Sequence, residues 1–161
     1  MKKLLTALVI IVSLGTAGSV CAQDYQKGGR ALNSDDYATA LREFKPLAER
    51  GNSGAQRGLG VMYDKGKGVV QDKKEAVKWY RKGAEQGDSD AQHLLAWYYK
   101  KGEGVIQDNV YAHMWFNIAA SNGTTAGAFS RDIMAKRMTA GDISKAQELA
   151  RACVAKKYKG C

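Results

Sequence analysis

The residues of this chain best suited to chemistry are two histidines and a pair of cysteines near the C-terminal end. His93 and His113 are the only histidines, and neither stands at a spacing used by metal ligands. The sequence contains no His-Glu-x-x-His, Gly-x-Ser-x-Gly or phosphate-loop motif. We therefore predict no catalytic residue, no metal site and no cofactor, and we interpret both histidines as packing or surface residues.

The cysteines point to a structural role. Cys153 and Cys161 form an even pair if Cys21 is removed with a secretory signal, and an oxidising compartment favours their pairing. In one continuous helix their Cα atoms would lie about 12 Å apart, which is too far for a disulfide. A bond therefore requires the helix to end near Lys157 and the chain to turn back at Gly160. We predict an intramolecular disulfide; free thiols or an intermolecular bond are the alternatives.

The first 22 residues have the pattern of a cleaved secretory signal. Residues 1–3 are Met-Lys-Lys, residues 4–12 are apolar apart from one threonine, and residues 20–22 read Val-Cys-Ala. A short positive region, an apolar core and small residues around the cleavage point are typical of such signals. We predict cleavage near Ala22 and a periplasmic or secreted location.

Two other interpretations of this segment remain open. A lipoprotein would be acylated at Cys21, although Val20 before it is large for that pattern. An uncleaved anchor would need about 20 apolar residues to span a bilayer, and the apolar core here is shorter.

The charge of the chain is positive and concentrated near its C-terminal end. The net charge is +9, and residues 123–161 carry eight Lys or Arg against three Asp or Glu. Such a segment could meet anionic lipid, an anionic envelope polymer or an acidic partner. The alternative is a solvated helix end, where the helix dipole favours cations. With a secretion signal present, no nucleic-acid partner is expected. The basic residues concerned include Lys145, Arg151, Lys156, Lys157 and Lys159.

The elements that must position these residues repeat along the chain. Residues 51–86 aligned without a gap on residues 87–122 give 15 identities in 36 positions. A period of this length is typical of stacked arrays, in which each unit buries its apolar face against its neighbours.

Each unit is predicted to be a helical hairpin. Ala55, Leu59 and Tyr63 recur at a spacing of four residues, which places them on one face of a first helix. Asp72, followed three residues later by Glu75, has the pattern of a capping box at the start of a second helix.

Glycines mark the ends of these helices. Gly66 and Gly68 allow a tight loop between the two helices of a unit. Gly87 and Gly123 stand where the second helix should end in a left-handed cap. The residues assigned to the repeat motif are Ala55, Leu59, Tyr63, Gly66, Gly68, Asp72, Ala76, Trp79 and Ala84 in one unit, and Ala91, Leu95, Tyr99, Gly102, Gly104, Asp108, Ala112, Trp115 and Ala120 in the next.

These motifs resemble a known family. Ala-Gln-x-x-Leu-x-x-x-Tyr, Gly-x-Gly-Val-x-Gln-Asp and Ala-x-x-Trp-[Tyr/Phe] are together similar to the Sel-one-like repeat family, a relative of the tetratricopeptide repeats. The resemblance covers about residues 35–157 and implies an all-α, right-handed α-solenoid of helix-turn-helix repeats. It also implies a non-enzymatic scaffold for protein–protein interactions. The expected organisation is a signal over 1–22, a degenerate repeat over 23–50, units over 51–86 and 87–122, and a degenerate repeat with a basic capping helix over 123–161.

Some residues depart from the family pattern. Val70 and Ile106 stand where such loops often carry proline, which predicts looser loops. Gly58 and Gly83 lie inside predicted helices at a cost of about 1 kcal/mol each. Pro46 should remove a hydrogen bond from its helix and bend it. We therefore expect modest stability.

Binding is expected on residues of the first helix of each unit that differ between the two good repeats. Trp97 and Tyr98 are the most suggestive, because aromatic residues and arginine dominate binding hot spots. The hypothesis is a groove for a peptide or protein segment, with Trp97 as its anchor; the alternative is that Trp97 is buried against the next repeat. The candidates are Arg57, Val61, Asp64, His93, Trp97, Tyr98 and Lys100.

An enzymatic function is kept in reserve. Some cysteine-rich members of the resembled family are associated with weak β-lactam hydrolysis or binding. This sequence has no Ser-x-x-Lys and lacks a cysteine pair in each repeat. We therefore do not expect an enzyme.

Overall fold

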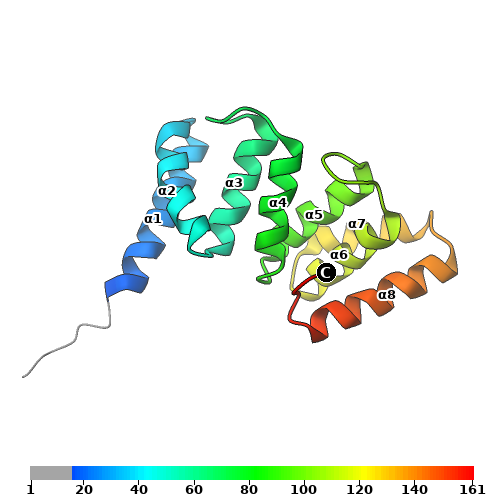
Figure 1. The fold of residues 1–161 in the computed structure, drawn as a ribbon. Helices are drawn as coiled ribbons and strands as arrows, with labels where there is room; N and C mark the ends of the chain where they lie inside the picture. The colour runs from blue at the N-terminus through cyan, green and yellow to red at the C-terminus, as the bar shows by residue number, and fades with distance from the viewer. Residues whose placement is uncertain (1–15) are drawn as a thin grey trace, which may run out of the picture.

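The computed structural model describes residues 16–161, which form eight α-helices and no β-strand (Figure 1). Most of the predicted signal, residues 1–15, lies outside the described residues. The chain is an all-α solenoid, as expected from the repeat. Its helices are α1 (Thr16–Asn33), α2 (Tyr37–Glu49), α3 (Ser53–Lys65), α4 (Lys73–Ala84), α5 (Ser89–Lys101), α6 (Asn109–Ser121), α7 (Thr125–Ala135) and α8 (Ala140–Ala155).

The first six helices form three hairpins that stand side by side (Figure 1). Helix α1 pairs with α2, α3 with α4 and α5 with α6, and each hairpin also packs on the next through α2 and α3 or α4 and α5. Helix α2 and the later part of α1 occupy residues 23–50, where a degenerate repeat is expected. Each hairpin therefore buries its apolar face against a neighbour.

Aspartates 36 residues apart begin the second helix of each hairpin. The side chains of Asp36, Asp72 and Asp108 accept hydrogen bonds from backbone N–H groups of the following turn. The capping box expected at Asp72 forms only in half. The Asp72 N–H donates to the carbonyl of Tyr63, so it needs no return bond from Glu75.

Glycines end the second helices in the predicted left-handed conformation. Gly51, Gly87 and Gly123 have φ values of 92°, 85° and 97°. The residue after each glycine donates its N–H to a carbonyl five residues earlier, as in the bond of 3.1 Å from Asp88 to Gly83. The three ends have the same geometry, which sets the 36-residue period.

The second glycine of each loop serves contact between repeats as well as a turn. Gly68 and Gly104 have φ values of 71° and 69°. A Cβ added at Gly104 would lie 2.4 Å from the carbonyl oxygen of Lys73, and one at Gly68 would lie 2.8 Å from Cβ of Tyr37. Tyr37 and Lys73 both begin the second helix of the preceding hairpin, so each loop rests on the unit before it.

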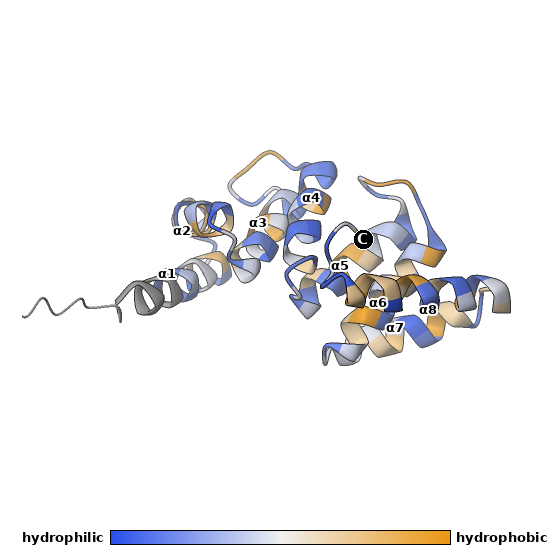
Figure 2. Ribbon diagram, turned by 60° about the horizontal axis from the view of Figure 1, so that its bottom comes forward, coloured by the Kyte–Doolittle hydropathy of each residue, from blue (hydrophilic) through white to orange (hydrophobic). Residues whose placement is uncertain are grey.

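The outer edges of these loops are apolar and project into solvent (Figure 2). Val70 and Ile106, the residues in place of proline, are 87% and 88% exposed.

Two helix-interior features predicted as costs have different outcomes. Gly58 provides space for a neighbour: a Cβ added there would lie 2.7 Å from the ring of Phe44. That ring is buried, and a Cβ added at Gly28 of α1 would also lie 2.7 Å from it. Pro46 does not break α2, which continues through it to Glu49.

The C-terminal part of the chain departs from the hairpin pattern. Helix α7 takes the place of a first helix and packs on α6. Helix α8 also packs on α6, along the lower edge of the array in Figure 1. Ala146, Ala150 and Cys153 are buried in the same core as α6. The last two helices therefore both cover α6.

Within residues 16–161, none of the helices combines the length and the apolar composition that a membrane span requires.

Candidate binding groove

The first helices of successive units present equivalent positions along one face. Val61 in α3, Trp97 in α5 and Ile133 in α7 lie 36 residues apart and are all accessible to solvent. Residues 57, 93 and 129 stand one turn before them and residues 65 and 101 one turn after, on the same helical face, while Arg137 lies just beyond the end of α7 at Ala135. This face, across α3, α5 and α7, is called the groove below.

Trp97 lies half-buried at the centre of the groove. Its ring packs edge-on against Tyr98, with centroids 5.1 Å apart, and the ammonium of Lys101 lies 5.5 Å from its centroid. Trp97 thus has one side on the core, as the burial hypothesis expects, and one side in solvent, as an anchor requires. A pocket of about 150 Å³ lies beside it, lined by Asp64, Lys65, His93, Leu94, Trp97 and Tyr98.

Tyr98 and Asp64 face inward and link α3, α4 and α5. Both are buried, and the Tyr98 hydroxyl donates to the Asp64 carboxylate. The ammonium of Lys73 lies 2.5 Å from the same carboxylate. Burial would raise the pKa of Asp64, but hydrogen bonds from Lys73, Tyr98 and Lys65 outweigh burial and hold that pKa below its usual value. The carboxylate is therefore occupied by internal partners.

Two further candidates are also engaged in contacts. Arg57 lies 3.2 Å from a carboxylate oxygen of Asp88 and 3.6 Å from one of Asp90. His93 approaches the hydroxyl of Ser130 in α7 at 3.3 Å. Burial lowers the pKa of His93, against a smaller opposing effect of Asp90. These side chains tie neighbouring first helices together at the rim of the groove.

Lys100 lines a second pocket of about 200 Å³, between α5 and α7. Ile133 and Arg137 on its far wall were missed by sequence reasoning. The signal that could have found them is the period itself, because they stand 36 residues after Trp97 and Lys101. The pocket is lined by Lys100, Gln107, Asn109, Ile133, Met134, Arg137 and Met138.

The matched tryptophans of the second helices have unequal surroundings. Trp115 is fully buried, because α6 is covered by both α7 and α8. Trp79 is half-buried, and the ammonium of Lys82 lies 4.0 Å from its ring centroid. Neither tryptophan lies at an exposed position of the groove. Both serve packing between units.

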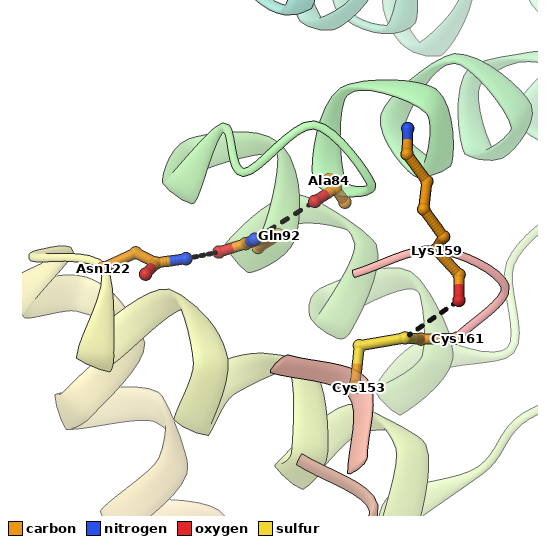
Figure 3. Close-up of a disulfide and its surroundings, with 6 residues drawn as sticks. All are labelled: Ala84, Gln92, Asn122, Cys153, Lys159 and Cys161. Atoms are coloured by element: carbon orange, nitrogen blue, oxygen red, sulfur yellow. Dashed lines mark hydrogen bonds between the residues drawn. A yellow bond between two sulfur atoms is a disulfide. The ribbon is translucent and has the colours of Figure 1, made fainter. Parts of the chain in front are cut away.

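A pair of buried glutamines, matched in the repeat but given no role from sequence, connects the units. Gln56 donates to the carbonyl of Ala48 at 3.0 Å, and Gln92 donates to that of Ala84 at 3.1 Å. The side-chain oxygen of each glutamine also accepts a hydrogen bond from a residue that follows the next helix. For Gln92 this residue is Asn122 (Figure 3). Each amide thus gives a second hydrogen bond to a helix-end carbonyl that also accepts the N–H of the capping glycine, Gly51 or Gly87.

The C-terminal turn is held by a disulfide between Cys153 and Cys161 (Figure 3). Their Cα atoms lie 5.6 Å apart, because α8 ends at Ala155 and the chain reverses. Lys157, Tyr158 and Gly160 all have positive φ in this turn. The Tyr158 hydroxyl donates to Asn122 at 3.1 Å, so the turn rests on the end of α6.

The chemistry of the groove is that of a contact surface. Among the described residues, no group of three or more His, Cys, Asp or Glu side chains is placed to hold a metal ion. His113 is buried inside α6, away from the groove positions, and its Nδ1 has no hydrogen-bond partner. The accessible groups of the groove are apolar surfaces and cations.

The Sel1 repeat family model matches residues 53–88 and 89–124. A Sel1 repeat protein from Oxalobacter formigenes is 34% identical, with a TM-score of 0.64, over 71% of this chain and 90% of that one. The chain belongs to the Sel1 repeat family. Its helix starts at Ser53 and Ser89 coincide with the first residues of the two matched repeats.

Two other Sel1-type structures are similar. The protein c5321, a protective antigen of uropathogenic Escherichia coli with an SLR fold, is 33% identical with a TM-score of 0.80 over 86% of this chain. This chain spans only 30% of that protein. Cysteine-rich protein B of Helicobacter pylori is 20% identical with a TM-score of 0.55, over 71% of this chain and 96% of that one. At this identity the likeness shows the shared fold alone. No curated protein is similar enough to this chain to count as a match.

Proposed function

We propose that this Sel1 repeat protein is a non-enzymatic scaffold that binds a peptide or protein segment in its groove. Proteins of the family are generally scaffolds for protein–protein interactions. The observation that carries the proposal for this chain is Trp97, which exposes one side of its ring beside a pocket while the core holds the other. A rigid, half-buried aromatic ring loses little conformational entropy when a ligand covers it.

The proposed place of action is the periplasm or the secreted space. The pattern of residues 1–22 supports secretion, with cleavage near Ala22. The disulfide between Cys153 and Cys161 suits the same oxidising surroundings.

Site-specific crosslinking tests groove binding. A photoreactive residue replaces Phe129, which is 69% exposed on α7 within the groove. The matched control replaces Val154, which is 47% exposed on α8 outside it. In cells that secrete the protein, we expect a discrete crosslinked partner from position 129 and not from position 154.

Specificity is tested by combining the crosslinker at position 129 with Trp97→Ala. The anchor hypothesis expects the crosslinked band to weaken by about tenfold, the change that corresponds to 1.4 kcal/mol of binding free energy. Equal yields from positions 129 and 154, or a yield unchanged by Trp97→Ala, would refute groove binding.

A second candidate function rests on the C-terminal basic residues. Lys145, Arg151, Lys156, Lys157 and Lys159 are all exposed on α8 and the turn after it. They could hold the protein on an anionic envelope polymer or membrane surface. Binding to a polyanion weakens steeply as salt rises, unlike binding to an apolar hot spot. Retention on anionic vesicles that disappears at high salt and in Lys156→Glu with Lys159→Glu would support this function.

The proposal includes the absence of a catalytic activity. The reserve alternative, weak hydrolysis or binding of β-lactams, is tested by turnover of a chromogenic β-lactam by the purified secreted protein. Hydrolysis above the buffer rate that survives further purification would overturn the scaffold proposal.

A further inference from the structure

The groove carries a second row of equivalent positions next to its apolar row. Lys65, Lys101 and Arg137 stand 36 residues apart, each four residues after its apolar neighbour. Four residues are about one helical turn, so Lys65 and Lys101 lie on the same face as the apolar residue before them, and Arg137 follows the end of α7. The contact of Lys101 with the Trp97 ring and the shared pocket of Ile133 and Arg137 show this arrangement directly.

The cations of the groove differ in what already pairs with them. At the α3 end, Lys65 lies 3.1 Å from Asp64 and Arg57 lies 3.2 Å from Asp88. At the α5–α7 end, three cations have no carboxylate oxygen within 4.0 Å among the described residues. They are Lys100, Lys101 and Arg137.

The same end also exposes apolar surface. Phe129 and Ile133 of α7 are 69% and 36% exposed, and Ile133 shares its pocket with Lys100 and Arg137. An apolar surface bordered by unpaired cations complements a ligand that has apolar side chains and carboxylates. Charge complementarity of this kind steers association and selects against cationic ligands.

We propose that the groove selects extended, acidic segments of partner proteins that carry apolar side chains between their carboxylates. This inference rests on the proposed function and names the chemistry of its partner. The carboxylates bind Lys100, Lys101 and Arg137, and the apolar side chains cover Trp97, Ile133 and Phe129. A second copy of this chain is a poor occupant, because two chains of net charge +9 repel each other.

The groove also sets the length of such a segment. Directly packed helices lie about 10 Å apart, and α3, α5 and α7 pack chiefly on second helices and not on one another, so they span at least about 20 Å. An extended chain advances about 3.3 Å per residue, so about six residues cross the groove. Successive repeats then meet side chains about three residues apart in the ligand.

The test uses three fluorescein-labelled peptides of about eight residues. The first has leucines about every third position and glutamates beside them, the second has lysines in place of the glutamates, and the third has serines in place of the leucines. Fluorescence anisotropy with the full secreted chain is expected to show binding of the first peptide alone, with the other two weaker by about tenfold or more.

Charge reversal within the protein provides a matched control. Lys101→Glu with Arg137→Glu should lower the affinity for the acidic peptide by about tenfold or more. Lys156→Glu with Lys159→Glu changes the net charge by the same amount outside the groove and should leave its affinity unchanged. Circular dichroism verifies that both variants are folded.

Three results would overturn the inference. The first is that both charge reversals weaken binding of the acidic peptide equally, and the second is that the glutamate and lysine peptides bind with equal affinity. The third is that the protein binds anionic vesicles and shows no preference among the peptides. If position 129 crosslinks a partner through a neutral or basic segment, the proposed function holds and the acidic selection fails. If no position in the groove crosslinks and no peptide binds, both fail.

Discussion

The Gln92 side-chain amide donates to the carbonyl oxygen of Ala84, across the boundary between two repeats. The glutamine is fully buried, and its own oxygen accepts a bond from Asn122. Gln56 makes the equivalent bond to Ala48 one unit earlier. The Gln92 side chain, at the start of its own unit, thus bonds both to the end of the preceding unit and to the end of its own unit.

Replacing this glutamine should therefore cost more than one hydrogen bond. Gln92→Leu removes the hydrogen bond to the Ala84 carbonyl, which keeps the Gly87 N–H as a partner, and the hydrogen bond from the Asn122 amide. Each such bond contributes about 0.5–1.5 kcal/mol, so the two together contribute about 1–3 kcal/mol. We expect the free energy of unfolding, measured in urea, to fall by about that amount.

The control for this prediction is Gln107→Leu. Gln107 donates to the Lys100 carbonyl at 3.0 Å but is exposed, so water can replace the bond. Its loss should change stability by less than about 0.5 kcal/mol. Similar losses from the two variants would show that burial of the amide is unimportant.

Two adjacent glycines of α1 are expected to respond in opposite directions to alanine. A Cβ at Gly28 would lie 2.7 Å from the buried Phe44 ring, whereas one at Gly29 has no atom within 4 Å. Gly28→Ala should destabilise by about 1–3 kcal/mol through overpacking. Gly29→Ala should stabilise by up to about 1 kcal/mol through helix propensity. Thermal unfolding of the two variants measures the effect. Melting temperatures that shift in the same direction would contradict the close packing of α1 on α2.

Stability should fall in mild acid because of a buried histidine. Burial, aided by nearby Arg131, lowers the pKa of His113, while Asp132 acts in the opposite direction. The folded-state pKa therefore lies below the unfolded value of about 6.5. Below that pH the unfolded chain binds more protons than the folded one, so stability decreases as the pH falls.

Urea unfolding at pH 7.5, 6 and 5 measures this effect, and His113→Leu isolates it. Leucine and valine stand at the equivalent positions 41 and 77, so the substitution suits the fold. The variant should lose less stability between pH 7.5 and 5 than the natural chain, by about 1.4 kcal/mol for each unit of pKa depression. His93, whose pKa is also lowered by burial, accounts for a remaining slope. An identical slope in both proteins would exclude His113 as the source.

Loss of the disulfide should weaken the cap. In the chain-entropy model, a loop this short contributes about 2.5 kcal/mol. Cys153→Ser with Cys161→Ser should lower the unfolding free energy by about that amount and release the turn that places Tyr158 on Asn122. Intact mass after alkylation provides the independent measurement, and two alkylated thiols in the unreduced native protein would refute the bond.

The repeat organisation could be predicted because geometry restricts its marker residues. The aspartates that begin helices, the left-handed glycines and the small residues between units each meet a backbone requirement, so their positions recur. The arrangement of α8 could not be predicted in the same way. Its sequence indicates a helix, but whether that helix forms a hairpin with α7 or packs on α6 depends on contacts between distant residues.

The groove was predicted only in part for a related reason. Variation between repeats marked both Trp97 and Tyr98, but adjacent residues on a helix point in different directions, so one faces solvent and the other the core. Ile133 and Arg137 were missed because identity with the earlier units fades after residue 122, even though the helix positions continue.

The position of α8 limits how this protein could be lengthened. Because α8 packs on α6 and does not complete a hairpin with α7, residues 125–161 do not form the face on which another unit stacks. A duplicated 36-residue unit would fit only upstream, at boundaries such as Gly87, where both sides keep the standard contacts. Engineered or evolved versions with longer grooves would therefore gain their units in the middle of the gene, with the terminal helices left in place.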